Sequence, residues 1–118
     1  MTTPQIANRL VELLRQGEFE TIYDELFHPE KVKNIDPQSP HFPEVIGVQA
    51  IKEKDEMMMQ NIAAIKGMQV GEAITSKDHI ALPYQISLDL KDGSSMELDE
   101  IIVYQVEEGK IILERFFY

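Results

Sequence analysis

Two glutamates in the C-terminal third of the chain have neighbours that favour acid–base chemistry. Glu100 and Glu114 each interrupt an apolar run, "MELDEIIVYQV" and "KIILERFFY". Two carboxyl groups that share a poorly solvated site disfavour each other's ionisation, which raises the pKa of at least one of them. A carboxyl with a raised pKa can serve as a general acid or base near neutral pH. Glu100 and Glu114 are therefore the candidate catalytic residues.

The strands that must position these residues have a two-residue hydrophobic period. The sequence predicts strands over residues 68–75, 79–90, 96–106 and 110–118, separated by the turns "SKD", "KDG" and "EEG". Both "KDG" and "EEG" are typical of three-residue hairpin loops with a left-handed glycine. With such loops Leu90 pairs with Ser94, and Val106 pairs with Lys110.

This register places both glutamates on the face that the helices must cover. Tyr84 is expected opposite Glu100, and Glu100 opposite Phe116, while Ile102 faces Glu114 and Leu98 faces Tyr118. The predicted inner face consists of Ile80, Leu82, Tyr84, Ile86, Leu88, Met96, Leu98, Ile102, Tyr104, Ile112, Phe116 and Tyr118. Candidate pocket residues are Tyr84, Tyr104, Ile102, Phe116, Tyr118 and Met58, since phenols can donate hydrogen bonds to a carbonyl oxygen and methionine suits an adaptable apolar pocket.

The same pattern also allows a structural role for the two glutamates. Glu100 would then hydrogen-bond a tyrosine, and Glu114 would be partnered by a basic side chain. If the last loop had an even number of residues, Arg115 would join Glu100 on the inner face and form a buried ion pair.

The N-terminal half is predicted to be mainly helical. Thr3 and Pro4 are expected to open a helix with a buried stripe of Ile6, Leu10, Leu13 and Leu14 that ends at Gly17. A second helix follows as far as His28-Pro29, and residues 32–36 form a short strand. The loop "PQSPHFP" is irregular because it holds three prolines. A third helix runs from Val48 to Gly67, with Ile51, Met58, Ile62 and Ile65 on one face.

Two polar residues near this loop are further candidates for the pocket. Asp36 precedes Pro37, and His41 lies among the prolines, where it is either exposed to solvent or reaches the mouth of a pocket. The three histidines share no ligand spacing, so we expect no metal site, and we expect no cofactor.

The outer face of the predicted sheet carries an apolar cluster of Ile101, Val103, Ile111, Leu113 and Phe117. Large exposed apolar patches mark interfaces. We therefore expect a homodimer that forms through Ile101, Val103, Leu113 and Phe117.

Composition narrows the class of protein. The chain of 118 residues has the length of one domain, and we treat 1–118 as a single unit. The net charge of −10 argues against nucleic acid or an anionic membrane as a partner. The absence of cysteine and of a leader segment or membrane span leads us to expect a cytoplasmic protein.

The order of these elements, with "ELFHPE", "GVQAIKE" and "YQVEEGKIILERFFY", resembles the nuclear-transport-factor-2-like superfamily and in particular its SnoaL-like branch. The resemblance spans the whole chain. It implies an α+β fold in which a curved mixed sheet wraps around three helices (α-α-β-α-β-β-β-β) as a cone with a pocket at its wide end, commonly as a homodimer.

The resemblance does not transfer one activity. In ketosteroid isomerase of this superfamily the general base lies in an Asp-Pro pair, which Asp36-Pro37 resembles. The two oxyanion residues would fall near Leu10 and near Ile101 or Ile102, which are apolar here. The two glutamates on an apolar face, together with the resemblance, lead us to expect a small apolar, carbonyl-containing ligand and isomerase-, cyclase- or hydrolase-like acid–base chemistry. The alternative is a non-catalytic ligand-binding or dimeric interaction module.

Overall fold

The computed structural model describes residues 1–118 as three helices and one sheet. The helices are α1 (Thr3–Gln16), α2 (Phe19–Leu26) and α3 (Val48–Met59). The strands are β1 (Lys33–Ile35), β2 (Glu44–Ile46), β3 (Ile62–Val70), β4 (Ile74–Thr75), β5 (His79–Leu90), β6 (Ser95–Glu107) and β7 (Lys110–Phe117). No helix combines the length and the apolar character that a membrane span requires.

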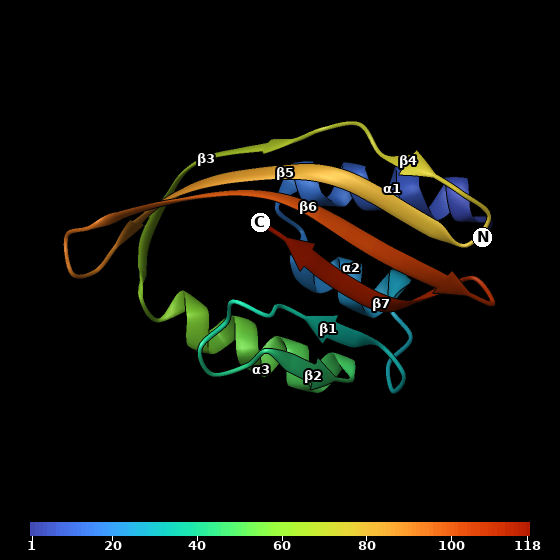
Figure 1. Ribbon diagram of the computed structural model, residues 1–118, viewed down its shortest axis with the longest axis horizontal. Helices are drawn as coiled ribbons and strands as arrows, with labels where there is room; N and C mark the ends of the chain where they lie inside the picture. The colour runs from blue at the N-terminus through green and yellow to red at the C-terminus, as the bar shows by residue number, and fades with distance from the viewer.

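The strands form a curved, open sheet that covers the helices on one side. Its order is β2-β1-β7-β6-β5-β3, with β4 paired to β5, and the β1–β7 pair is parallel while the others are antiparallel. In Figure 1 the long strands β5 and β6 arch over α1 and α2, and α3 lies beside β1 and β2. The predicted α+β class with three helices and a curved mixed sheet is confirmed.

The first two helices follow the prediction closely. Ile6, Leu10, Leu13 and Leu14 are all buried in the core, and Gly17 ends α1 in the left-handed conformation. The predicted cap at Thr3 is wrong. Thr2 is the N-cap, in a capping box with Gln5, and the buried Thr3 instead donates its hydroxyl to the carbonyl oxygen of Lys77 at 2.8 Å.

The third helix is shorter than predicted. It ends at Met59 rather than at Gly67, and residues 62–70 form strand β3 along the edge of β5. Ile62 and Ile65 are thus strand residues, because pairing satisfies backbone groups of β5 that a longer helix would leave open. The predicted strand 68–75 is divided between β3 and β4, and the short strand β2 was not predicted.

The β5–β6 hairpin has the predicted register. Tyr84 pairs with Glu100 and Leu82 with Ile102, and the Leu90 amide donates to the Ser94 carbonyl oxygen at 2.8 Å. Gly93 has a φ of 90°, which only glycine adopts readily.

The β6–β7 hairpin has a different register from the predicted one. The loop has two residues, Glu108 and Gly109, both with positive φ, so Glu107 rather than Val106 pairs with Lys110. One extra residue on β7, Ile112, then forms a bulge, since Val106 pairs with Ile111 but Gln105 pairs with Leu113.

The observed loop and bulge together differ from three predictions about β7. Ile111 is fully buried rather than on the outer face, whereas Ile112 is only half-buried. Tyr104 rather than Ile102 pairs with Glu114, and Ile102 pairs with Phe116. Although the loop is even, Arg115 stays on the outer face opposite Val103, because the bulge restores the alternation.

A buried chain of hydrogen-bonded side chains, which we call the polar chain, connects α3 to the sheet. The Lys54 ammonium donates to Asn34 Oδ1 at 2.7 Å, and Asn34 Nδ2 donates to Glu114 Oε1 at 2.7 Å. Lys54 also donates to the carbonyl oxygen of Phe42 at 3.0 Å, which ties the 37–43 loop to the same helix. Lys54, Asn34 and Glu114 are all buried, so each of these groups depends on its neighbour for hydrogen bonds.

Replacing Lys54 by Met should destabilise the fold through this chain. The variant leaves the Asn34 amide oxygen and the Phe42 carbonyl without their donor, which costs about 1–3 kcal/mol for each buried group. Lys52→Met is the control, since Lys52 lies on the same helix but pairs with the exposed Asp24. Urea denaturation should show a clear loss for Lys54→Met and less than about 1 kcal/mol for Lys52→Met. Equal losses would contradict a special role for Lys54.

Candidate functional site

Glu100 lies inside the cone without a hydrogen-bond partner from the chain. The residue is 6 % exposed. Its two carboxyl oxygens accept no hydrogen bond from the chain, and they are not completely shielded from solvent. The carboxyl group therefore still contacts space that water can enter. Tyr84 pairs directly with it on β5, as the sequence predicted.

Burial is the main cause that raises the pKa of Glu100, to about 7, and the nearby charge of Asp36 adds to it. No basic group offsets these effects. The carboxyl group therefore changes its protonation state near neutral pH, which is what a general acid or base requires.

Tyr84 is the cross-strand neighbour of Glu100, and its hydroxyl is directed towards β3. Its hydroxyl donates to the Met68 sulfur at 3.3 Å, and a thioether is a weak acceptor. Burial, with the charge of Glu100, raises the pKa of Tyr84 to about 12, so the phenol stays protonated. A ligand oxygen can replace the sulfur with a gain in hydrogen-bond strength.

The end of β7 and the segment after β1 meet beside Glu100. The Tyr118 hydroxyl donates to Asp36 Oδ1 at 2.6 Å, and Gln38 Nε2 donates to the Tyr118 carbonyl oxygen at 2.6 Å. Burial and the bond to Asp36 raise the pKa of Tyr118. The fold thus brings together Asp36, Glu100 and Tyr118, of which Asp36 is far from the other two in the sequence.

Glu114 has a different environment from Glu100. Burial raises its pKa to about 7, and the charge of Asp55 contributes, whereas bonds from Asn34 and Tyr104 and the charge of Lys54 oppose the shift. Burial lowers the pKa of Lys54, although the negative charges of Asp36, Glu114 and Asp55 act to raise it. Glu114 is therefore enclosed in a polar chain, while Glu100 has no hydrogen-bond partner from the chain.

A second buried pair lies next to this chain. The Tyr23 hydroxyl donates to Asp55 Oδ2, which connects α2 to α3. Burial raises the pKa of Asp55, while the Tyr23 bond and Lys54 lower it. The cone thus holds several carboxyl groups and one buried lysine.

The remaining predicted site residues are spread over different environments. Ile102 and Tyr104 are fully buried, Phe116 is half-buried, and His41 is exposed, with its ring centroid 6.4 Å from that of Phe42. Met58 is 46 % exposed near the end of α3.

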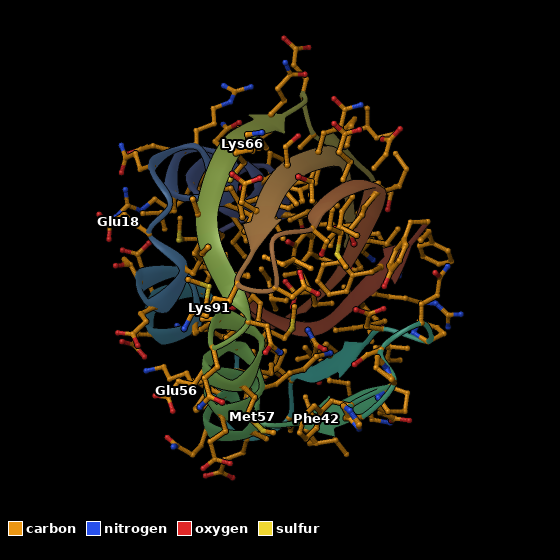
Figure 2. The ribbon with its side chains drawn as sticks, turned by 90° about the vertical axis from the view of Figure 1, so that its left-hand side faces the viewer. Glu18, Phe42, Glu56, Met57, Lys66 and Lys91 are labelled. Atoms are coloured by element: carbon orange, nitrogen blue, oxygen red, sulfur yellow. The ribbon has the colours of Figure 1, made fainter.

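Met58 belongs to an apolar rim at one end of the molecule. Figure 2 looks at this end, where the hairpin residue Lys91 lies near α3, and Lys91 donates its amide to the Asn61 carbonyl oxygen at 2.9 Å. Ile65, Leu88 and Met96 form a cross-strand row on the face that carries Glu100. We call the exposed members the apolar rim: Met57, Met58, Met59, Ile65 and Met96.

Sequence reasoning missed Asn34, Lys54 and Asp55. A signal was present, because Lys54 and Asp55 lie three and four residues after Ile51 and so share its buried face. Asn34 likewise alternates with the buried Val32. Polar residues at positions of a buried stripe are candidates for internal networks.

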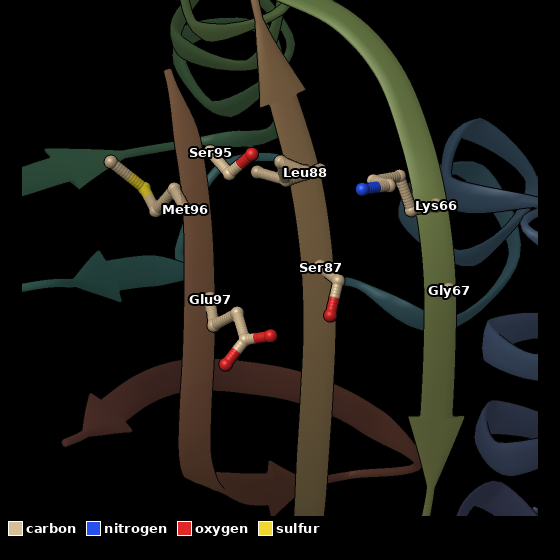
Figure 3. A pocket seen from close by; sticks show the side chains of 7 residues that line it. All are labelled: Lys66, Gly67, Ser87, Leu88, Ser95, Met96 and Glu97. Carbon is tan, nitrogen blue, oxygen red and sulfur yellow. The ribbon is translucent and has the colours of Figure 1, made fainter.

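Two hollows of the surface lie elsewhere, over β3, β5 and β6. The hollow in Figure 3 has a volume of about 230 Å³ and is lined by Lys66, Gly67, Ser87, Leu88, Ser95, Met96 and Glu97. A neighbouring hollow of about 450 Å³ is lined by Gly67, Met68, Gln69, Gln85, Ser87, Glu97 and Asp99. Neither includes Glu100 or Glu114.

Comparisons with known proteins agree with the architecture. A proposed SnoaL-like polyketide cyclase from Mesorhizobium loti superposes with a TM-score of 0.92 at 26% identity, over 100% of both chains. An NTF2-like protein of unknown function from Burkholderia pseudomallei has a TM-score of 0.77 at 17% identity, over 97% of this chain and 88% of its own. TerC, co-crystallised with polyporic acid, has a TM-score of 0.72 at 17% identity, over 92% and 84%.

No curated protein sequence matches the chain. The model of the SnoaL-like domain matches residues 1–118, in agreement with the predicted resemblance. The chain therefore belongs to the SnoaL-like domain family, within the NTF2-like fold.

Proposed function

We propose that this domain binds a small apolar, carbonyl-containing molecule inside the cone and that Glu100 acts on it as an acid or base. One observation carries the proposal: Glu100 is a buried carboxyl with a pKa raised to about 7 and no partner from the chain. A structural glutamate in such a place would have its hydrogen bonds satisfied.

The chemistry follows from the neighbours of Glu100. Its carboxylate takes a proton from the carbon next to the carbonyl group, and the Tyr84 hydroxyl hydrogen-bonds the enolate oxygen that develops. Glu100 then returns the proton to carbon or to oxygen. The apolar rim offers an entrance for an apolar ligand, because these side chains are already exposed to water.

Glu114 has a positioning role in this proposal. Its bonds to Asn34 and Tyr104, with Lys54 behind Asn34, hold β1, β6, β7 and α3 in one arrangement around the site. The similarity to a proposed polyketide cyclase is consistent with chemistry at carbonyl-activated carbon. TerC, which was crystallised with polyporic acid, supports ligand binding by this fold.

Non-catalytic ligand binding is the second candidate function. It is favoured by the fact that Glu114, the second predicted catalytic residue, is committed to the polar chain, which leaves one carboxyl group for chemistry. Both candidates place the ligand beside Glu100, and they differ in whether a proton moves.

We also propose that the domain forms a homodimer through Ile101, Val103, Leu113 and Phe117. Ile101 is 44 % exposed and Phe117 47 % exposed, and they pair with each other on the outer face. Arg115 lies among them with its Cζ atom 4.9 Å from the centre of the Phe117 ring, and its Nε is buried without a partner. A second copy would cover this apolar surface.

The first test concerns the pH dependence of stability. The folded-state pKa of Glu100, about 7, lies above its ordinary value of 4.5, so the folded protein binds more protons between these values. The free energy of unfolding should fall as pH rises through this window. Glu100→Gln removes this part of the slope and should match the wild type below pH 5 and exceed it at pH 8 by on the order of 2 kcal/mol.

Thermal and urea unfolding from pH 4.5 to pH 8 measures this difference. Glu97→Gln is the matched control, because Glu97 is an exposed residue on the outer face of the same strand. A large, pH-dependent loss of stability in Glu100→Gln would mean that Glu100 is structural.

The second test asks whether Glu100 moves protons. With 2-tetralone as a probe in D₂O, proton NMR should show that the wild type accelerates exchange of the hydrogens next to the carbonyl group. Glu100→Gln should reduce this acceleration about a hundredfold or more, and Tyr84→Phe should reduce it less. Glu97→Gln should exchange like the wild type. Binding of the probe without exchange would favour the non-catalytic candidate.

The third test addresses the dimer. Sedimentation velocity at micromolar concentration should give a dimer for the wild type and a shift towards monomer for Val103→Lys, which introduces a charge into the apolar patch. Tyr84→Phe, on the opposite face, should sediment like the wild type. A monomeric wild type would contradict the proposal.

A further inference from the structure

Glu100 has the surroundings of a cation site but no cation from the chain. Glu100 is 6 % exposed, its carboxyl group makes no hydrogen bond with the chain, and the negative charge of Asp36 acts on it. Two carboxyl groups with no positive charge between them repel each other, and a buried charge normally requires a partner. Ionised Glu100 is therefore a negative charge inside the cone that has no positively charged partner.

Aromatic side chains border this position. Tyr84 pairs with Glu100 across the strands, and Tyr118 lies one residue beyond Phe117, the partner of Ile101. Tyr118 lies close enough for the charge of Glu100 to affect its pKa. The faces of tyrosine rings attract cations, more strongly at the buried Tyr84 than at Tyr118, which is 45 % exposed.

The other charged groups around Glu100 are already engaged. Asp36 accepts a hydrogen bond from Tyr118, and Lys54 on α3 donates to Asn34 and to Phe42. The phenols of Tyr84, Tyr104 and Tyr118, which also face this part of the cone, have raised pKa values and remain neutral. No basic side chain of the chain therefore neutralises Glu100.

We propose that the cone binds an organic cation, a protonated or quaternary amine with apolar substituents, whose nitrogen lies against Glu100 and whose substituents contact Tyr84 and Tyr118. This inference rests on the pocket of the proposed function. With such a ligand Glu100 is an ion-pair partner rather than a base, so the amine competes with the carbonyl compound for the same place.

Two further features agree with this ligand class. The net charge of −10 attracts cations to the protein and repels anions. Ile65 and Met96 of the apolar rim lie on the same sheet face as Glu100 and add apolar surface that suits the alkyl or aryl substituents of such an amine. A carboxylate ligand would instead meet Asp36 and Glu100 as like charges.

The experiment compares two probes of the same shape, phenyltrimethylammonium and its uncharged isostere tert-butylbenzene. Isothermal titration calorimetry at pH 8 should show at least tenfold tighter binding of the ammonium compound by the wild type. Because the cation requires ionised Glu100, its affinity should fall about tenfold between pH 8 and pH 6, and binding at pH 7 should release protons to the buffer.

Two variants test whether Glu100 is responsible for the preference for the cation. Glu100→Gln should lose the preference for the cation, whereas Glu97→Gln, which removes the same charge from the outer face, should keep it. Equal affinity for the two probes, or a preference that survives in Glu100→Gln, would overturn the inference.

A third probe separates this inference from the proposed function. If 2-tetralone binds and the ammonium compound does not, the cation site is wrong while the carbonyl site stands. If neither 2-tetralone nor the two isosteres bind, the pocket itself is wrong, and both proposals fail together.

Discussion

The burial of a single lysine shapes much of this molecule. Lys54 is 4 % exposed, and its ammonium group needs acceptors from the protein because little of the side chain reaches water. Asn34 and the Phe42 carbonyl provide these acceptors, and Asn34 in turn donates a hydrogen bond to Glu114. A helix, a parallel strand pair and a proline-rich loop are thereby fixed relative to each other around one polar chain.

This constraint explains why two similar glutamates have different surroundings. Both lie on the inner face of the sheet, and burial raises the pKa of both to about 7. Glu114 meets β1, which brings Asn34 next to it, whereas Glu100 lies on β6, where the neighbours are Tyr84 and the end of β7. Strand order, rather than residue type, separates the carboxyl group that is hydrogen-bonded within the polar chain from the one that has no partner from the chain.

Much of the fold follows from local patterns, and the errors have physical causes. The stripe of α1 and the register of the β5–β6 hairpin depend on nearby residues and are predicted correctly. The extension of α3 to Gly67 was wrong because "IAAIKG" suits a helix or a strand, and the edge of β5 decides between them. Asp36 and Tyr118 meet only through tertiary structure, so their hydrogen bond could not be read from the chain.

The bulge at Ile112 has a consequence for the chemistry of the interior. A two-residue loop alone would shift β7 by one position, which would turn Arg115 inward and Glu114 outward. The extra residue reverses that shift, so one inserted amino acid decides whether the cone is lined by an acid or by a guanidinium. Insertions and deletions in the β6–β7 hairpin are therefore a route by which domains of this architecture can invert the charge of a buried side chain on β7 while retaining the same fold.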